Sequence, residues 1–162
     1  MSKHSRDELI HEFIAAVRAA QTANQMLDSA IADFLGVHGS AYRCLDILDQ
    51  EGPMTAGELA QRARLSPGAT TTIVDRLEEK GLARRTRDTA DRRRVLLEVT
   101  PELRRRGEQL YGKPEDAGAA LAMYSDEQLE FLTQFMHGNR AFQLQKMQEL
   151  ERLKARDSEA QR

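Results

Sequence analysis

The sequence predicts a mainly α-helical chain with one small β-hairpin. Three observations support this fold class. Apolar residues recur at helical spacing near both ends of the chain, capping residues and glycines mark the ends of several short helices, and two strand-like runs flank a polar loop. A length of 162 residues, 40% of them hydrophobic, suits one compact domain with helical extensions.

A long helix is predicted from about Ser5 to Phe34. Ser5 and Glu8 form a capping box, in which each side chain can hydrogen-bond the backbone amide of the other residue. The apolar positions follow helical spacing: Leu9, Phe13, Val17, Ala20, Leu27, Ile31 and Phe34. One small domain cannot cover a stripe of this length, so we expect residues 1–35 to form a dimerisation helix.

Shorter helices are predicted next. One covers residues 40–50 and ends at Gly52, and a capping box of Thr55 and Glu58 opens the following one. Ser66, which precedes a proline, is placed to cap the start of another helix. Two short helices joined by a tight turn, the second well capped, indicate a helix-turn-helix.

The predicted hairpin follows directly. Gly81 is placed to end the preceding helix, residues 82–86 and 95–99 read as strands, and the polar segment 87–93 joins them. A hairpin at this position in a helix-turn-helix domain is called a wing. We therefore expect a winged helix-turn-helix domain in residues 36–100.

The C-terminal third is predicted to be helical. Thr100 and a following proline restart a helix that runs to about Tyr111, and Ser125 opens the last long helix. We expect residues 101–152 to form C-terminal dimerisation helices and residues 153–162 to form a frayed, charged tail.

Charge is distributed unevenly along the chain. The formal net charge is −2, but residues 61–106 contain 13 Lys and Arg against 7 Asp and Glu, a local charge of +6, which leaves −8 for the rest. Such segregation is typical of a module that meets phosphates on one face. A solvated charged surface is an equally open interpretation of the charge alone.

Several classes of function have no support in the sequence. The single cysteine, Cys44, and four scattered histidines form no metal-binding pattern, and no catalytic grouping appears, so we expect neither an enzyme nor a cofactor. We expect Cys44, which adjoins apolar positions, to be a buried and inert thiol, with a redox switch as the alternative. With no bilayer-length apolar run and no signal-peptide segment, we expect a cytoplasmic protein without a membrane partner.

Several short motifs between Thr55 and Thr100 resemble one family. They are Gly57-Glu58-Leu59-Ala60, Leu65-Ser66-Pro67-Gly68-Ala69-Thr70, Val74-Asp75-Arg76-Leu77-Glu78, Lys80-Gly81-Leu82 and, most specifically, the wing sequence Asp88-Thr89-Ala90-Asp91-Arg92-Arg93 ahead of Thr100. This pattern resembles the MarR family of winged helix-turn-helix regulators, and the helical order extends the resemblance over nearly the whole chain. Thr89, Val99 and the late Gly107 depart from the family pattern. The resemblance implies a homodimer that binds an inverted-repeat operator in double-stranded DNA, as a repressor released by a small-molecule effector.

Two elements are expected to contact DNA. On the helix after Ser66, the face of Thr70, Ile73, Val74 and Leu77 should pack inward, and the opposite face should contact base edges and phosphates. The resemblance implies that one wing-tip arginine enters the minor groove while Asp91 braces it, and Arg93 has the favoured Asp-x-Arg spacing. Arg84, Arg85 and Arg87 are expected to add phosphate contacts. The DNA-binding set is Thr55, Ser66, Gly68, Thr71, Thr72, Arg76, Arg84, Arg92 and Arg93.

Each of these expectations has a structural alternative. The threonines and Arg76 would then be merely solvated, and the wing Asp-Arg pair would close the hairpin without touching DNA. A winged helix that binds a protein, or a structural dimer without specific DNA binding, is the alternative function. The basic wing and the small residues at the helix start favour duplex DNA.

An effector site is expected at the junction between the dimerisation and DNA-binding regions. Candidate residues are Arg18, His38, Tyr42 and Arg43, because arginine with tyrosine suits a phenolic or carboxylate ligand. A purely structural role for His38 at this junction is the alternative.

Overall fold

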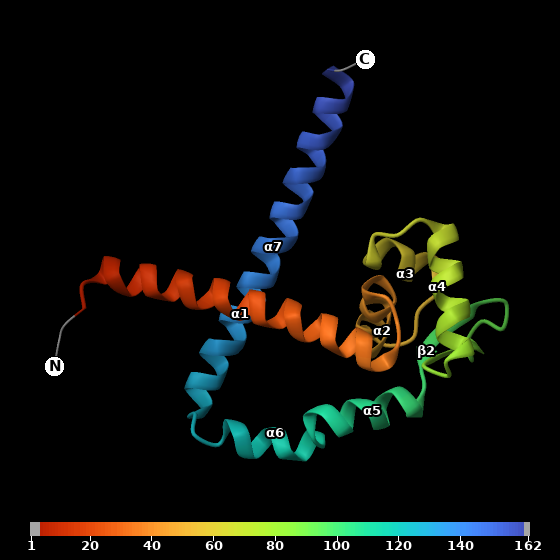
Figure 1. Cartoon of the computed structure of the whole chain (residues 1–162), viewed down its shortest axis with the longest axis horizontal. Helices are drawn as coiled ribbons and strands as arrows, with labels where there is room; N and C mark the ends of the chain where they lie inside the picture. Colours follow the sequence, from red (N-terminus) through yellow and green to blue (C-terminus); the bar gives the residue numbers. More distant parts are fainter. Residues whose placement is uncertain (1–3, 161–162) are drawn as a thin grey trace. The chain divides into compact units, whose positions relative to one another are not determined.

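The computed structural model describes the backbone of residues 4–160, and the side chains of that range except those of residues 114, 115, 117 and 158–160. The chain divides into two units, residues 1–111 and 112–162. The first contains α1 (Arg6–Leu35), α2 (Gly39–Glu51), α3 (Ala56–Ala63), α4 (Pro67–Glu79), β1 (Ala83–Arg87), β2 (Val95–Val99) and α5 (Pro101–Tyr111). The second contains α6 (Pro114–Leu121) and α7 (Asp126–Ala160) (Figure 1).

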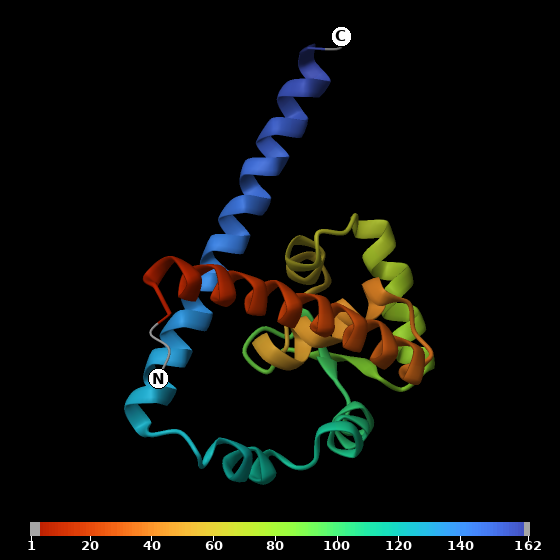
Figure 2. The ribbon, with the colours of Figure 1, turned by 60° about the vertical axis from the view of Figure 1, so that its left-hand side comes forward.

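The predicted order of helices and hairpin is confirmed. In the first unit, α2, α3, α4 and the hairpin gather around the C-terminal end of α1, and the N-terminal part of α1 extends away from them (Figures 1 and 2). Their buried side chains form one hydrophobic core, which includes Leu35, Leu45, Leu59, Leu77 and Leu97. This core fixes the positions of α4 and the hairpin relative to each other.

Local capping explains where the helices begin. The Ser5 hydroxyl accepts a hydrogen bond from the amide of Glu8, and the Glu8 carboxylate accepts one from the amide of Ser5. Ser66 is likewise the N-cap residue of α4, and Pro67 is the first helical residue. Between α3 and α4, Arg64 adopts a left-handed conformation with φ 56°, which a non-glycine residue adopts rarely and which makes the tight turn.

The hairpin is a two-stranded antiparallel sheet. Ala83 pairs with Val99 at its base and Arg87 with Val95 toward its tip. An isolated bridge adds Met54 to the outer side of the sheet, through backbone hydrogen bonds of 3.2 and 2.8 Å with Leu97. The wing is therefore anchored at its base, where Leu97 and Val99 are buried, and projects beyond that anchor.

Two boundaries differ from the prediction. The first strand is shifted by one residue toward the tip, because Leu82 packs in the core before the ladder starts. Residues 153–160, expected to fray, continue α7. The boundary between the two units follows Tyr111, at Gly112, which has a φ of 75°. The division of the chain into functional domains stays a prediction.

Many apolar side chains are exposed in this single chain. On α1 they include Leu9, Phe13, Leu27 and Phe34, each about half exposed, and on α7 they include Phe131, Met136 and Phe142. No helix in the described part of the chain has both the length and the hydrophobicity needed to cross a membrane.

Candidate nucleic-acid interface

Helix α4 has a buried face and an exposed face, as predicted. Thr70, Val74 and Leu77 are at most 1% exposed, and Ile73 packs partly against the same core. Gly68, Thr71, Thr72 and Arg76 lie on the exposed side. The predicted inward face is confirmed, and the residues expected to meet DNA are accessible.

The first turn of α4 is preorganised. The Ser66 hydroxyl accepts the amide of Ala69 at 3.3 Å. The hydroxyls of Thr71 and Thr72 donate to the carbonyls of Pro67 and Gly68, four residues earlier, both at 3.1 Å. Because each threonine proton is used within the helix, the hydroxyl oxygen is left to accept a hydrogen bond and the methyl to contact a thymine methyl. These threonines can therefore accept hydrogen bonds from DNA and make apolar contacts with it, but they do not donate hydrogen bonds to it.

Gly68 is small for a reason other than internal packing. A Cβ added at this position would meet no atom within 4 Å, and the residue has no left-handed φ. Folding therefore does not require glycine here. An open space in front of a helix N-terminus lets a DNA backbone approach the free amides of the first turn.

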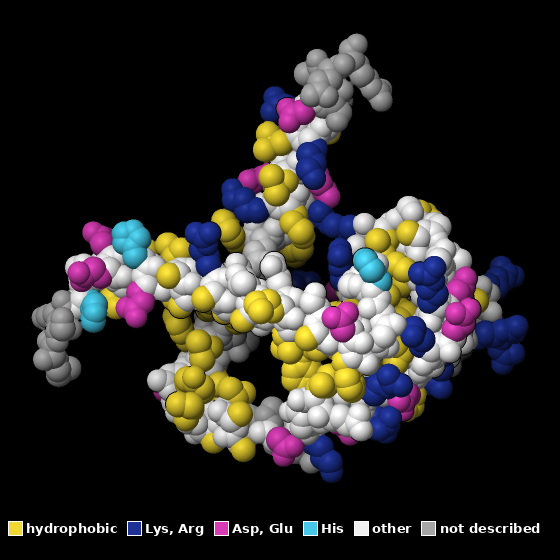
Figure 3. All heavy atoms as spheres, in the orientation of Figure 1, with side chains coloured by type: hydrophobic (Ala, Val, Ile, Leu, Met, Phe, Trp, Pro, Cys, Tyr) yellow, Lys and Arg dark blue, Asp and Glu magenta, His cyan; other side chains and the backbone are white. Residues whose placement is uncertain are grey.

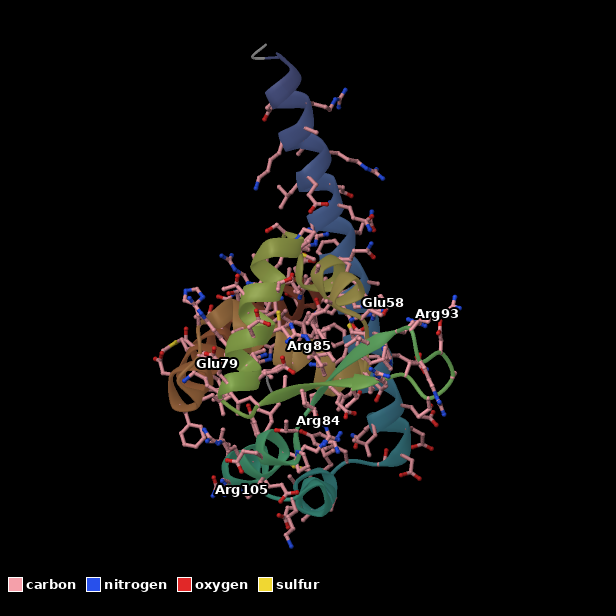
Figure 4. All side chains as sticks on the ribbon, turned by 90° about the vertical axis from the view of Figure 1, so that its right-hand side faces the viewer. Glu58, Glu79, Arg84, Arg85, Arg93 and Arg105 are labelled. Atoms are coloured by element: carbon pink, nitrogen blue, oxygen red, sulfur yellow. The ribbon has the colours of Figure 1, made fainter. Side chains whose placement is uncertain are left out.

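Two aspartates shape the wing tip. The carboxylate of Asp88 accepts the amide of Ala90 at 2.8 Å, and that of Asp91 accepts the amide of Arg93 at 3.0 Å. Backbone hydrogen bonds join Asp88 to Arg94 and Arg94 to Asp91. Asp91 thus braces the tip by binding the backbone amide of Arg93. The guanidinium of Arg93 extends from the loop (Figure 4).

The arginines of the hairpin fall into two groups. Arg84 pairs with Glu98 across the ladder at 2.7 Å, and Arg85 pairs with Asp75 and Glu78 of α4. Arg94 reaches Glu58 at 3.4 Å and Asp88 at 3.8 Å. Arg87, Arg92 and Arg93 form no ion pair with any residue that the structure describes. The same is true of Arg76 on α4.

These unpaired arginines define the basic surface. Figure 3 shows several Lys and Arg side chains projecting from the end of the first unit that carries α4 and the hairpin. Arg84 and Arg85 were predicted to contact phosphates, but carboxylates already neutralise both side chains. Their contact with DNA stays a prediction, with the unpaired cations of the same surface better placed to make it.

Thr55 has a local role in the structure. Its hydroxyl donates to the Glu58 carboxylate at 2.7 Å and its amide donates to the same oxygen at 2.7 Å. These bonds from Thr55 hold the pKa of Glu58 below its usual value, so the carboxylate stays charged beside Arg94. The cap of α3 and the wing are linked in this way, through Arg94, which directly precedes β2.

A pocket of about 380 Å³ lies between α1 and α2 in the first unit. Its lining residues are Gln25, Asp28, Ser29, Gly39, Tyr42, Arg43 and Asp46. Of the four residues predicted for an effector site, Tyr42 and Arg43 line it, and Arg18 and His38 do not. His38 instead caps α2, with its Nδ1 accepting the amide of Ser40 at 3.4 Å.

Two carboxylates, Asp28 and Asp46, and one guanidinium, Arg43, line this pocket. Burial raises the pKa of Tyr42 to about 12, and the charges of Asp46 and Asp28 add to that rise. Burial also raises the pKa of Asp46, and Asp28 adds to this rise, whereas the hydrogen bond from Gln50 lowers it. The sequence reasoning missed both aspartates, since neither belongs to a recognisable motif. Their only sequence signal is spacing that places them on helix faces beside Ser29 and Tyr42.

The prediction for the single cysteine is met. Cys44 is fully buried, and burial raises the pKa of its thiol, which disfavours the reactive thiolate. Among the residues with described positions, no group of three His, Cys, Asp or Glu side chains could hold a metal ion.

Comparison with known proteins identifies the family. The model of the MarR family matches residues 38–95. The relative named "Uncharacterized HTH-type transcriptional regulator YcgE", from Bacillus subtilis (strain 168), is 34% identical over 154 residues, which cover 94% of this chain and 98% of the relative. The chain belongs to the MarR family.

Further comparisons agree with this membership. The HTH-type transcriptional repressor MdtR of Bacillus subtilis (strain 168) is 33% identical over 100 residues, which cover 60% of this chain and 63% of MdtR. A solved structure of a MarR family protein from Bacillus stearothermophilus has a TM-score of 0.57 at 22% identity, covering 87% of this chain and 99% of that one, and so shares the fold. The resemblance inferred from the wing motif is confirmed: this is a MarR-family transcriptional regulator with a DNA-binding winged helix-turn-helix.

Proposed function

We propose that this MarR-family regulator is a homodimeric repressor that binds an inverted-repeat operator and is released by a small-molecule effector. The observation that carries the proposal is the pairing of an open, threonine-lined α4 face with unpaired arginines on a braced wing tip. A recognition helix suits the major groove, and an extended arginine suits the narrow minor groove beside it. Repression is supported by the name of MdtR, the repressor that is 33% identical to this chain over 100 residues.

The homodimer is supported by the exposed apolar side chains of the long helices. Leu9, Phe13 and Phe34 on α1 are 53, 50 and 52% exposed. Exposing so many large apolar side chains to water is unfavourable. A second copy of this chain, packed against them, is the simplest way to bury them. A two-fold dimer would present two α4 helices about one DNA turn apart, which requires a two-fold symmetric operator.

Nuclease footprinting with light scattering tests this proposal. We expect a dimer mass at micromolar concentration and protection of an inverted repeat near the gene for this protein. A monomer mass would contradict the dimer. A dimer that protects no DNA would instead favour the alternative function, a protein-binding or structural winged helix.

The junction pocket is the proposed effector site. Tyr42 and Arg43 suit a phenolic ligand, but Asp28 and Asp46 line the same pocket. A ligand carboxylate would meet Coulomb repulsion from both aspartates, whereas a phenol or ammonium group could donate a hydrogen bond to them. Of the phenolic and carboxylate ligands that the sequence suggests, we therefore favour the phenolic class, as a neutral or cationic aromatic effector.

A matched pair of ligands tests the effector charge. Tyramine and 4-hydroxyphenylacetate share a phenol and differ in the charge of the side arm. We expect tyramine to bind more tightly and to lower operator affinity more strongly, and Asp46→Asn to reduce this difference. Tighter binding of the carboxylate compound would show that Arg43 dominates the pocket and would contradict this choice.

A further inference from the structure

Arg85 connects the wing to the recognition helix. Its guanidinium donates to Asp75 at 2.7 Å and also pairs with Glu78, and its backbone amide donates to the other oxygen of Glu78 at 2.8 Å. The hydrogen bond to Asp75 is the main cause of the raised pKa of Arg85. Figure 4 shows Arg85 between α4 and the hairpin.

The two carboxylates are arranged to hold a guanidinium. Asp75 and Glu78 are three residues apart on α4, so their side chains lie on the same face of the helix. The planar guanidinium can donate to both at once, which a lysine ammonium cannot do with the same geometry. All three side chains therefore form one link between β1 and α4.

This link lies closer to the wing tip than the other ties between these elements. At the base, Leu82 and Ala83 are buried, and the chain itself turns at Gly81. Beyond the base, β1 is mostly exposed, and Arg85 is the residue of this stretch that reaches back to α4. The Met54–Leu97 bridge and the Arg94–Glu58 pair hold the wing on the side of α3. Without the Arg85 link, β1 would be tied to α4 only at its base, and the angle between the wing and α4 would be less firmly fixed.

We propose that Arg85 is a positioning residue for DNA binding, one that fixes the angle between wing and recognition helix and does not contact phosphate. The inference rests on the proposed DNA-binding surface. The guanidinium of Arg85 is already paired with two carboxylates, so a DNA phosphate would have to displace them before it could bind Arg85. Its effect on affinity acts through the placement of Arg93, which lies on the tip loop beyond it.

Salt dependence distinguishes the two roles. Each phosphate contact releases a condensed counterion, so losing one contact lowers the slope of log affinity against log salt by about 1. Losing a positioning residue lowers the affinity, but the bound protein contacts the same number of phosphates, so the slope does not change. Arg87 is the matched control, because it lies on the same strand and has no ion pair with a described residue.

The experiment compares Arg85→Gln with Arg87→Gln in full-length protein, by anisotropy titration with operator duplex from about 50 to about 300 mM salt. We expect Arg85→Gln to weaken binding about tenfold at each salt concentration with an unchanged slope, and Arg85→Lys to recover part of the loss. Arg87→Gln should lower the slope by about 1. An Arg85→Gln slope that falls like that of Arg87→Gln would overturn the proposal.

Two further measurements separate this inference from the proposed function. In the Asp75→Asn, Glu78→Gln background, Arg85→Gln should have no further effect, because the link is already broken. An equal loss in both backgrounds would contradict the link. In protein without DNA, Arg85→Gln should speed amide hydrogen exchange in residues 88–94 and Arg87→Gln should not. Unchanged exchange would overturn the positioning role even if the wild type bound no DNA at all.

Discussion

The paired and the unpaired arginines of the wing use the same residue type in opposite ways. Arg84, Arg85 and Arg94 are neutralised by carboxylates from β2, α4 and α3. At the tip, Arg92 and Arg93 extend from a loop whose turns are fixed by aspartates bonding backbone amides. A count of positive charges treats these arginines alike. The structure assigns rigidity to one set and leaves the other available to a ligand.

The strongest test of this difference is Arg93→Ala. We expect binding to weaken by about 1–3 kcal/mol, roughly fivefold to 150-fold, because a minor-groove contact is lost. The melting temperature should stay unchanged, since the guanidinium has no described ion pair. Anisotropy titration and thermal denaturation measure the two quantities. Unchanged affinity at physiological salt would remove the tip from the DNA-binding surface.

Gly68 extends the comparison to the recognition helix. Gly68→Leu should fold normally, because the position is open, but it should weaken operator binding about tenfold by holding DNA away from the amides of α4. Gly68→Ala is the milder control and should raise helix stability slightly. Equal DNA affinity of the leucine variant and the wild type would show that DNA does not approach this turn.

Arg94→Ala examines a paired arginine of the wing. We expect a loss of affinity of about threefold, smaller than for Arg93, because Arg94 acts through Glu58 and its pairs are exposed and long. The salt slope should not change. A loss as large as that of Arg93→Ala, with a lower slope, would place Arg94 on the phosphates.

Arg84→Gln should have the smallest effect on DNA binding. Its pair with Glu98 is solvent-exposed, so we expect a stability loss below about 1 kcal/mol. Operator affinity should change less than twofold. The Glu98→Gln variant is the matched control and should lose a similar amount of stability. A strong, salt-dependent loss of DNA affinity in Arg84→Gln alone would restore the phosphate role expected from the sequence.

Asp46 offers a contrast in charge at the junction pocket. Burial and neighbouring carboxylates raise its pKa, so the folded state holds its proton more tightly than the unfolded state. That stabilises the protein below the unfolded pKa and is lost as pH rises through the raised value. Asp46→Asn should therefore be more stable relative to wild type at about pH 7 than at about pH 3. Thermal melts at both values measure this, and an opposite trend would contradict the raised pKa.

The sequence predicts the fold because local signals agree with one another. Capping at Ser5, Thr55 and Ser66, the glycine after α4 and the alternation in β2 locate almost every element. It also predicts which face of α4 is buried, since Thr70, Val74 and Leu77 follow one helical stripe. Helical propensity in the charged C-terminal end was underestimated, because charge alone suggested fraying and α7 continues to Ala160.

The candidate site was harder to predict because ion pairing is a tertiary property. Nothing in the run from Arg84 to Arg87 distinguishes an arginine that meets α4 from one that meets solvent. Arg85 lies close enough to pair with Asp75 and Glu78 only because the chain turns at Gly81. The same limit applies to the pocket, where Asp28 and Asp46 come from different helices and only the fold brings them beside Tyr42.

Competition between two duplexes tests the central claim most directly. One carries the sequence upstream of the gene for this protein, and the other has the same base composition in scrambled order. We expect the wild type to prefer the first by at least about a hundredfold at physiological salt, and Arg93→Ala to lose most of that preference. Equal affinity for both duplexes, unaffected by Arg93→Ala, would contradict the account of a sequence-reading helix beside a groove-binding wing.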